Sequence, residues 1–165
     1  MDEKEPEYPL EQVLEVKKKR VERAEKVVHE KKSALEVEEE KMKKCEAARD
    51  EVKDHYDDKL AQLRAVLDEG STAPKIQQMK VYLKVVKEKL DVEEKKVSDQ
   101  QQEVEKAQKN LEEAEEELRK RRQEVDKIET HREEWTKEMK AEMIKKEGIE
   151  QDEMGNIIFL GKKRK

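Results

Sequence analysis

The chain has 165 residues, of which 50% are charged and only 3% are aromatic, a composition that excludes a globular domain with a central apolar core. Its formal charge of -5 comes from 39 basic and 44 acidic residues that are mostly interleaved, so there is no net basic field for a nucleic acid. No apolar run approaches the roughly 18 residues that a membrane-spanning helix needs, and we expect no membrane insertion.

The first predicted helix begins near Pro9. Residues 1–8 are charged and contain Pro6, so we expect them to form a mobile lead-in. Pro9 suits a first helical turn, where its missing N–H has no consequence. Over about residues 9–68, a heptad ladder predicts a helix with one narrow apolar stripe. Its main positions are Leu14, Val21, Val28, Leu35, Met42, Arg49, Tyr56 and Leu63.

Residues 69–74 are predicted to form a tight turn. Gly70 can take the left-handed conformation after a helix end, Ser71 or Thr72 can cap the next helix, and Pro74 fits its first turn. So short a connection cannot span the length of a helix, and the chain must therefore fold back on itself.

A second ladder predicts a helix over about residues 75–147. Its main positions are Ile76, Leu83, Leu90, Val97, Val104, Leu111, Leu118 and Val125. Each stripe is too narrow to be stable alone, so the two helices should pack together. The predicted fold class is all-α: a single long antiparallel two-helix coiled-coil hairpin over residues 9–147.

The register that joins the two ladders predicts which residues face each other. It places Leu14 opposite Ile128 and Arg49 opposite Glu93, which has the opposite charge. The seam is diluted around Glu38 and Gln100, where we expect the hairpin to be least stable.

Gly148 is expected to end the second helix. Residues 148–165 then form a charged, flexible C-terminal tail. This tail carries an apolar quartet, residues 157–160, and a basic end. The alternative is that the quartet docks on a partner.

The predicted hairpin offers no concave, partly dry pocket for converging catalytic groups, so we do not expect an enzyme. His29, His55 and His131 lie far apart in the predicted register, and no Cys/His spacing matches a zinc site. There is no phosphate-binding loop, dinucleotide turn or nucleophile elbow. We therefore expect no cofactor and no metal.

Two surface features are candidates for binding a partner. The first, which we call the valine stripe, is formed by Val81, Val85 and Val92 with Tyr82 beside them, on the outer face of the second helix near the turn. Their spacing suits a groove or a helix on a partner, although single exposed valines are also ordinary.

The second feature is a set of basic residues that the register brings to one level, which we call the basic girdle. Its members are Lys17, Lys18, Lys19, Arg20, Arg23, Arg119, Lys120, Arg121 and Arg122. Stacked like charges repel each other, and nearby glutamates could have been placed to relieve that repulsion. This favours a docking surface for an acidic partner over two solvated charge runs.

Residues 8–28, which begin Tyr-Pro-Leu, resemble the N-terminal signature of the YscO-type stalk proteins of type III secretion systems, specifically the chlamydial branch. Similar matches occur at residues 79–86, 131–138 and 150–155. The Tyr-Pro-Leu start, the Glu-Glu-Trp that ends at Trp135 and the Asp-Glu-Met-Gly that ends at Gly155 are not requirements of a coiled-coil seam.

This resemblance implies a counterpart of the flagellar export protein FliJ and of the central stalk of rotary ATPases. It implies a cytoplasmic hairpin, peripherally associated with the secretion apparatus at the inner membrane. Such a hairpin binds the hexameric secretion ATPase, promotes its assembly and coupling, and links it to the export gate. Some family members also bind chaperones. The isolated protein is then expected to be a monomer.

Two other functions remain open on the residues alone. One is a passive coiled-coil scaffold or chaperone-like arm that acts by self-association through its seam. The other is a nucleic-acid-binding arm, which the balanced charge disfavours.

Overall fold

The computed structural model describes residues 6–163 and contains two helices joined by a short turn. Helix α1 spans Glu11–Glu69 and helix α2 spans Ala73–Lys163. The chain divides into two compact units. We call Lys26–Glu116 the turn unit, and Met1–Glu25 with Glu117–Lys165 the terminal unit. No strand occurs in residues 6–163, so the predicted all-α class is confirmed.

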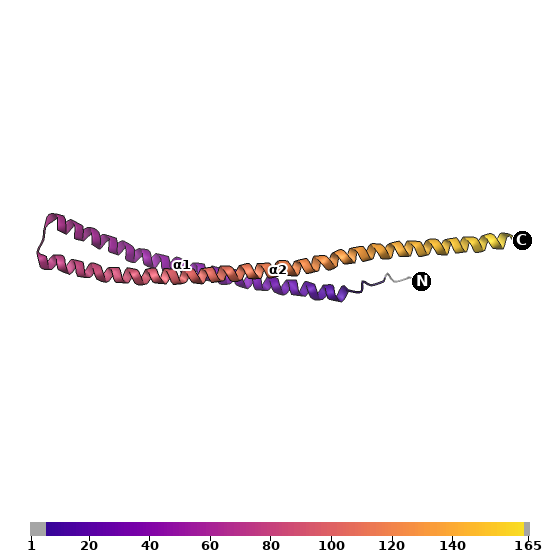
Figure 1. Cartoon of the computed structure of the whole chain (residues 1–165), viewed down its shortest axis with the longest axis horizontal. Coiled ribbons are helices and arrows are strands. Elements are labelled where there is room, and N and C mark those ends of the chain that lie inside the picture. The colour runs from indigo at the N-terminus through magenta and orange to yellow at the C-terminus, as the bar shows by residue number, and fades with distance from the viewer. Residues whose placement is uncertain (1–5, 164–165) are drawn as a thin grey trace. The chain divides into compact units, whose positions relative to one another are not determined.

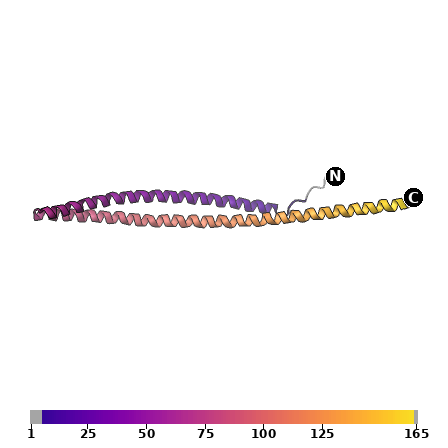
Figure 2. The same ribbon diagram turned by 90° about the horizontal axis from the view of Figure 1, so that it is seen from above.

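In the turn unit, the last part of α1 runs antiparallel to the first part of α2 (Figures 1 and 2). Gly70 ends α1 with a φ of 85°, and its N–H donates to the Val66 carbonyl at 2.9 Å. The Ile76 N–H donates to the Thr72 carbonyl at 3.2 Å and so begins the hydrogen bonding of α2. As predicted, Gly70 follows α1 in the left-handed backbone conformation, and Thr72 is at the N-cap position of α2.

The core of the turn unit is the predicted seam. Val86, at 1% exposure, is the most deeply buried residue of this unit. The other buried apolar residues of the unit are Val28, Leu35, Leu63, Leu90, Ala107, Leu111 and Ala114. Val28, Leu35, Leu63, Leu90 and Leu111 are main positions of the two ladders, and Val86, Ala107 and Ala114 lie three residues after a main position of the second ladder. Each helix therefore buries its period-3.5 stripe against the other.

The diluted middle of the seam contains a polar layer. Gln100 Nε2 donates to the backbone oxygen of Glu38 at 3.0 Å and to its carboxylate at 2.7 Å. Arg49 and Glu93, which the register predicts to face each other, each have an ion-pair partner on their own helix. Arg49 hydrogen-bonds to its neighbour Asp50, and Glu93 pairs with Lys96 at i+3 on α2.

In the terminal unit, α1 begins at Glu11, whose N–H donates to the Tyr8 carbonyl at 3.2 Å. Leu14 is 1% exposed and Tyr8 is 7% exposed, so both are part of the core. The prediction that residues 1–8 form a mobile lead-in is therefore wrong at Tyr8, because that side chain is packed against α2. Residues 1–5 lie outside the described residues.

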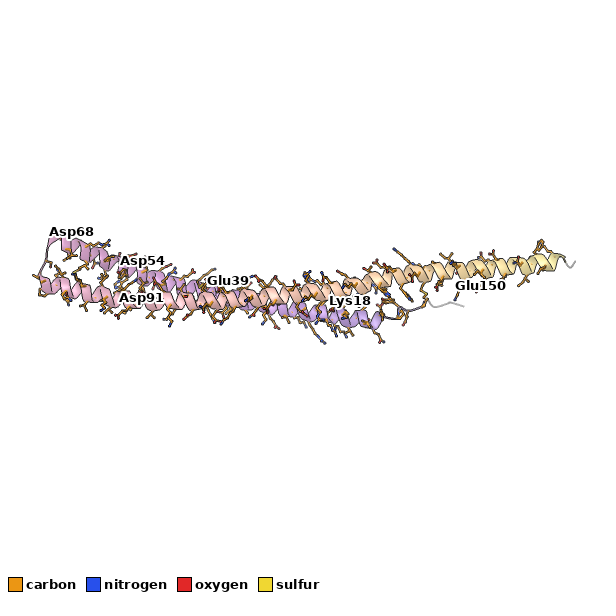
Figure 3. The ribbon with its side chains drawn as sticks, viewed as in Figure 1. Lys18, Glu39, Asp54, Asp68, Asp91 and Glu150 are labelled. Atoms are coloured by element: carbon orange, nitrogen blue, oxygen red, sulfur yellow. The ribbon has the colours of Figure 1, made fainter. Side chains whose placement is uncertain are left out.

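Helix α2 does not end at Gly148, as the sequence led us to expect, but continues through Gly155 to Lys163. A glycine inside a helix costs about 1 kcal/mol relative to alanine but does not prevent the helix from continuing, and the flanking Glu, Lys and Met residues are good helix formers. Glu150, labelled in Figure 3, lies in this extension. The predicted tail of residues 148–165 is thus helical as far as Lys163, and residues 164–165 lie outside the described part. Neither helix contains, within residues 6–163, a stretch apolar enough to cross a membrane.

Candidate partner-binding surfaces

Contacts between α1 and α2 in the terminal unit bring the two basic runs of the girdle alongside each other, as predicted. Lys17 Nζ lies 3.0 Å from Glu124 Oε2, and Arg122 Nη2 lies 3.3 Å from Glu25 Oε1. Each contact joins a basic residue of one helix to a glutamate of the other. The girdle therefore contains acidic residues as well as basic ones.

These glutamates relieve the repulsion within the girdle. Arg121 Nε donates to Glu117 at 2.8 Å and Arg121 Nη1 to Glu124 at 3.4 Å, while Lys18 Nζ lies 3.6 Å from Glu129. The premise that the like charges are left to repel each other is wrong. Partly exposed pairs of this kind each contribute at most about 1 kcal/mol to stability, so their main effect is on the local charge.

Glu124 forms ion pairs with both Lys17 and Arg121. The hydrogen bond from Lys17 lowers the pKa of the Glu124 carboxyl below its ordinary value, and the positive charge of Arg121 acts in the same direction. Glu124 is therefore ionised at neutral pH. Because its pKa is lower in the folded chain, its contribution to stability is present at neutral pH and is lost as the pH falls through that lowered pKa.

Four other residues of the girdle are not neutralised by ion pairs within the described residues. Lys19, Arg20, Arg23 and Lys120 are exposed and form no ion pair with any residue between 6 and 163. Lys18, labelled in Figure 3, belongs to the same run of α1. The part of the girdle best suited to an acidic partner is thus this smaller unpaired set.

The valine stripe is exposed, as its predicted position on the outer face of α2 requires. Val81, Val85 and Val92 are 54%, 42% and 55% exposed. Tyr82 is 45% exposed, and its hydroxyl lies 2.9 Å from His55 Nε2 on α1. This contact holds the tyrosine beside the stripe and orients its ring.

An aromatic cluster that sequence reasoning missed joins the start of the chain to α2. The Tyr8 hydroxyl is hydrogen-bonded to His131 Nδ1, and the Tyr8 ring centroid lies 5.5 Å from that of Trp135 in an edge-on arrangement. Beside it, Arg132 Nη1 lies 3.2 Å from Glu11 Oε1. We call Tyr8, His131 and Trp135 the aromatic clasp. The sequence did carry a sign of this cluster: Tyr8 and Trp135, two of the few aromatic residues of the chain, lie near the outer ends of the two ladders.

No group of three or more His, Cys, Asp or Glu in the part of the chain that the structure describes is arranged to hold a metal ion. Cys45 is a free thiol, half-buried on the seam of α1 where the heptad pattern places it. The girdle offers charge and the valine stripe offers apolar contact, both of which can bind another macromolecule.

Comparisons with known proteins agree with this architecture. No curated protein matches the chain. Among solved structures, a protein described as a YscO homolog, CT670 from Chlamydia trachomatis, is 50% identical with a TM-score of 0.92, and the match covers 98% of this chain and 99% of that one. A chain in the structure of the Chlamydia pneumoniae CdsV and CdsO protein complex is 49% identical with a TM-score of 0.50. That match covers 51% of this chain and 98% of the other.

The family model of YscO-like proteins matches residues 5–165, which is nearly the whole chain. The resemblance noted at the Tyr-Pro-Leu start and around Trp135 is thus confirmed by comparisons over the full length. The chain belongs to the YscO-like family.

Proposed function

We propose that this chain is a cytoplasmic stalk component of a type III secretion system, which binds the hexameric secretion ATPase, promotes its assembly and coupling, and links it to the export gate. The observation that carries the proposal is membership of the YscO-like family over nearly the whole chain. The similarity to a chain of the CdsV and CdsO complex supports a role in assembly with another protein.

The basic girdle is our proposed contact with the ATPase. Its unpaired cations, Lys19, Arg20, Arg23 and Lys120, would face an acidic collar on that partner. Complementary charge of this kind raises the rate of association and makes binding sensitive to salt. Because glutamates already neutralise Lys17 and Arg121, those two residues should contribute less than the unpaired set.

The first prediction tests this contact. Changing Lys19, Arg20, Arg23 and Lys120 to Glu should weaken binding of the purified ATPase by at least about tenfold at low salt, because favourable steering becomes repulsion. Binding is measured by surface plasmon resonance at two salt concentrations, and ATPase stimulation in parallel. Circular dichroism checks that the helices persist.

The matched control reverses four exposed lysines of α1 in the turn unit that form no ion pair within residues 6–163. They are Lys32, Lys43, Lys44 and Lys53. This variant has the same change in net charge and should bind the ATPase much better than the girdle variant does. Equal binding by the two variants would show that only net charge matters, and the girdle would lose its role.

The valine stripe is our proposed contact with the export gate or a secretion chaperone. The second prediction is that changing Val81, Val85 and Val92 to Lys abolishes one of these interactions while helicity is unchanged. The reason is that all three side chains are exposed in the free chain, so charge is tolerated there but not in an apolar contact. Copurification with the gate protein and with each chaperone measures the effect.

The control for this stripe is a second set of exposed valines, on α1. Val13, Val16 and Val37 are 42%, 50% and 53% exposed, and changing them to Lys adds the same charge. This control should retain every interaction. If the stripe variant also retains every interaction, the valine stripe is ordinary solvent-exposed surface.

A further inference from the structure

A polar layer interrupts the seam of the turn unit. Glu38 and Gln100 each lie three residues after a main ladder position, Leu35 on α1 and Val97 on α2. Gln100 Nε2 donates to the Glu38 carboxylate at 2.7 Å and to the Glu38 backbone oxygen at 3.0 Å. The second carboxylate oxygen lies 3.5 Å from Lys41 Nζ. Both oxygens of this half-buried carboxylate therefore have a partner.

Such a pair occurs once in the seam. Among the main ladder positions and the positions three residues after them, Glu38 is the only carboxylate on α1 and Gln100 is the only amide on α2. An isolated polar pair in an apolar seam contributes little to stability, because the loss of hydration offsets most of the gain from the contact. Its effect is on specificity, since only one alignment of the helices brings this donor and this acceptor together.

The apolar stripes by themselves permit other alignments. Sliding one helix along the other by one heptad, about 10 Å, again places a stripe on a stripe, because each ladder repeats every seven residues. Either slide lengthens the connection at the turn by one heptad, and the entropic cost of a connection grows only slowly with its length. The stripes and the turn therefore leave two shifted alignments as competitors.

In both shifted alignments the polar layer is broken. One slide brings Glu38 beside Glu93, whose side chain is 22% exposed, so that two carboxylates repel each other within the seam. The other slide brings Glu38 beside Ala107 and Gln100 beside Cys45. These neighbours offer the carboxylate no donor and the amide only a weak acceptor. Half-buried polar groups without partners disfavour both shifted alignments.

We propose that Glu38 and Gln100 form a register lock, a polar pair that selects one alignment of α1 on α2 rather than adding stability. The lock keeps together residues of the two helices that form one surface. His55 on α1 lies 2.9 Å from Tyr82 on α2, beside the valine stripe, and a slide of one heptad separates them by about 10 Å. The register lock is a property of the hairpin itself and does not depend on the partners proposed above.

Disulfide trapping in the full chain, with Cys45 changed to Ala, measures the alignment. Four buried seam residues of the turn unit are changed to Cys in pairs: Val28, Leu35, Ala107 and Ala114. Leu35 with Ala107 and Val28 with Ala114 face each other in the predicted register. Leu35 with Ala114 and Val28 with Ala107 face each other only after a slide of one heptad. Without a slide, an offset of about 10 Å along the helices is too long for a disulfide, so these two pairs report the shifted alignments.

The unlocked variant has Glu38 and Gln100 both changed to Leu. In a glutathione redox buffer, its ratio of shifted to native disulfide should be at least about tenfold above that of the chain with the lock in place. The reason is that each partnerless polar group disfavours a shifted alignment by roughly that factor. The midpoint of urea unfolding should be unchanged or higher, since apolar residues replace a half-buried polar pair. Circular dichroism checks that the helices persist.

The matched control makes the same two substitutions outside the seam. Glu39 and Gln102 are exposed, so changing both to Leu alters the composition equally and should leave the shifted disulfides at the level of the chain with the lock in place. A rescue variant has Gln100 changed to Lys. It keeps a donor for the Glu38 carboxylate and should retain the native alignment.

A ratio that does not rise in the unlocked variant overturns the proposal, as does an equal rise in the exposed control or in the rescue variant. Loss of stability in the unlocked variant with only native disulfides also overturns it, because the pair would then stabilise the seam without selecting its alignment. Gel mass separates disulfides within one chain from those between chains. A rise confined to disulfides between chains counts against the register lock as well.

Discussion

Replacing Leu14 by Ala is expected to lower the free energy of unfolding by about 2–5 kcal/mol. The Leu14 side chain is 1% exposed and lies between α1 and α2 in the terminal unit. The substitution removes buried methyl groups and leaves a cavity that two helices in register cannot readily close. Urea unfolding followed by circular dichroism at the helical band measures the change.

The same substitution at an exposed leucine separates burial from helix propensity. Leu67 lies in α1 and is 49% exposed, so Leu67→Ala removes the same atoms mainly from solvent. Alanine is also the better helix former, and the loss there should be well under that at Leu14. If the two substitutions cost the same, Leu14 is not part of a packed seam.

The parts of the fold that depend on repeated or local signals were predictable from the sequence. Leu14, Leu63 and Leu90 are buried because a period of 3.5 on a helix leaves a single stripe to be covered. The turn was predictable because a φ of 85° is accessible to glycine at little cost, which fits Gly70. Neither inference needed any knowledge of side-chain conformation.

The details of the candidate surfaces depend on side-chain reach, which the heptad pattern does not specify. Lys17 pairs with Glu124 and Lys18 pairs with Glu129. Neither glutamate is at the position of α2 that the register places directly opposite its lysine. Long flexible side chains choose among several such partners. The location of the basic girdle was therefore predictable from the sequence, but the neutralisation of part of its charge by glutamates was not.

The ends of the helices were the least predictable part. Gly148 was expected to stop α2, but glycine only lowers helix stability, and the helix continues to Lys163. Tyr8 was assigned to the lead-in because Pro9 follows it and the preceding residues are charged. Its burial depends on His131 and Trp135, more than a hundred residues later, which no local pattern reveals.

Tyr8→Ala is expected to cost about 3–5 kcal/mol of unfolding free energy, as for other buried aromatic residues. The ring is 7% exposed, packs edge-on against Trp135 and holds the chain before α1 on α2. Tyr8→Phe keeps the ring and removes only the hydrogen bond to His131, so it should cost about 0.5–1.5 kcal/mol. Urea unfolding of each variant measures these losses.

A double-mutant cycle with Trp135→Ala isolates the contact between the two rings. Edge-on aromatic pairs contribute roughly 0.5–1.5 kcal/mol beyond burial, so the double variant should lose less than the two single losses added together. Tyr82→Ala serves as the matched control, because Tyr82 is also hydrogen-bonded to a histidine but is 45% exposed. Additive losses in the cycle, or a loss at Tyr82 as large as at Tyr8, would mean that the aromatic clasp does not fasten the start of the chain to α2.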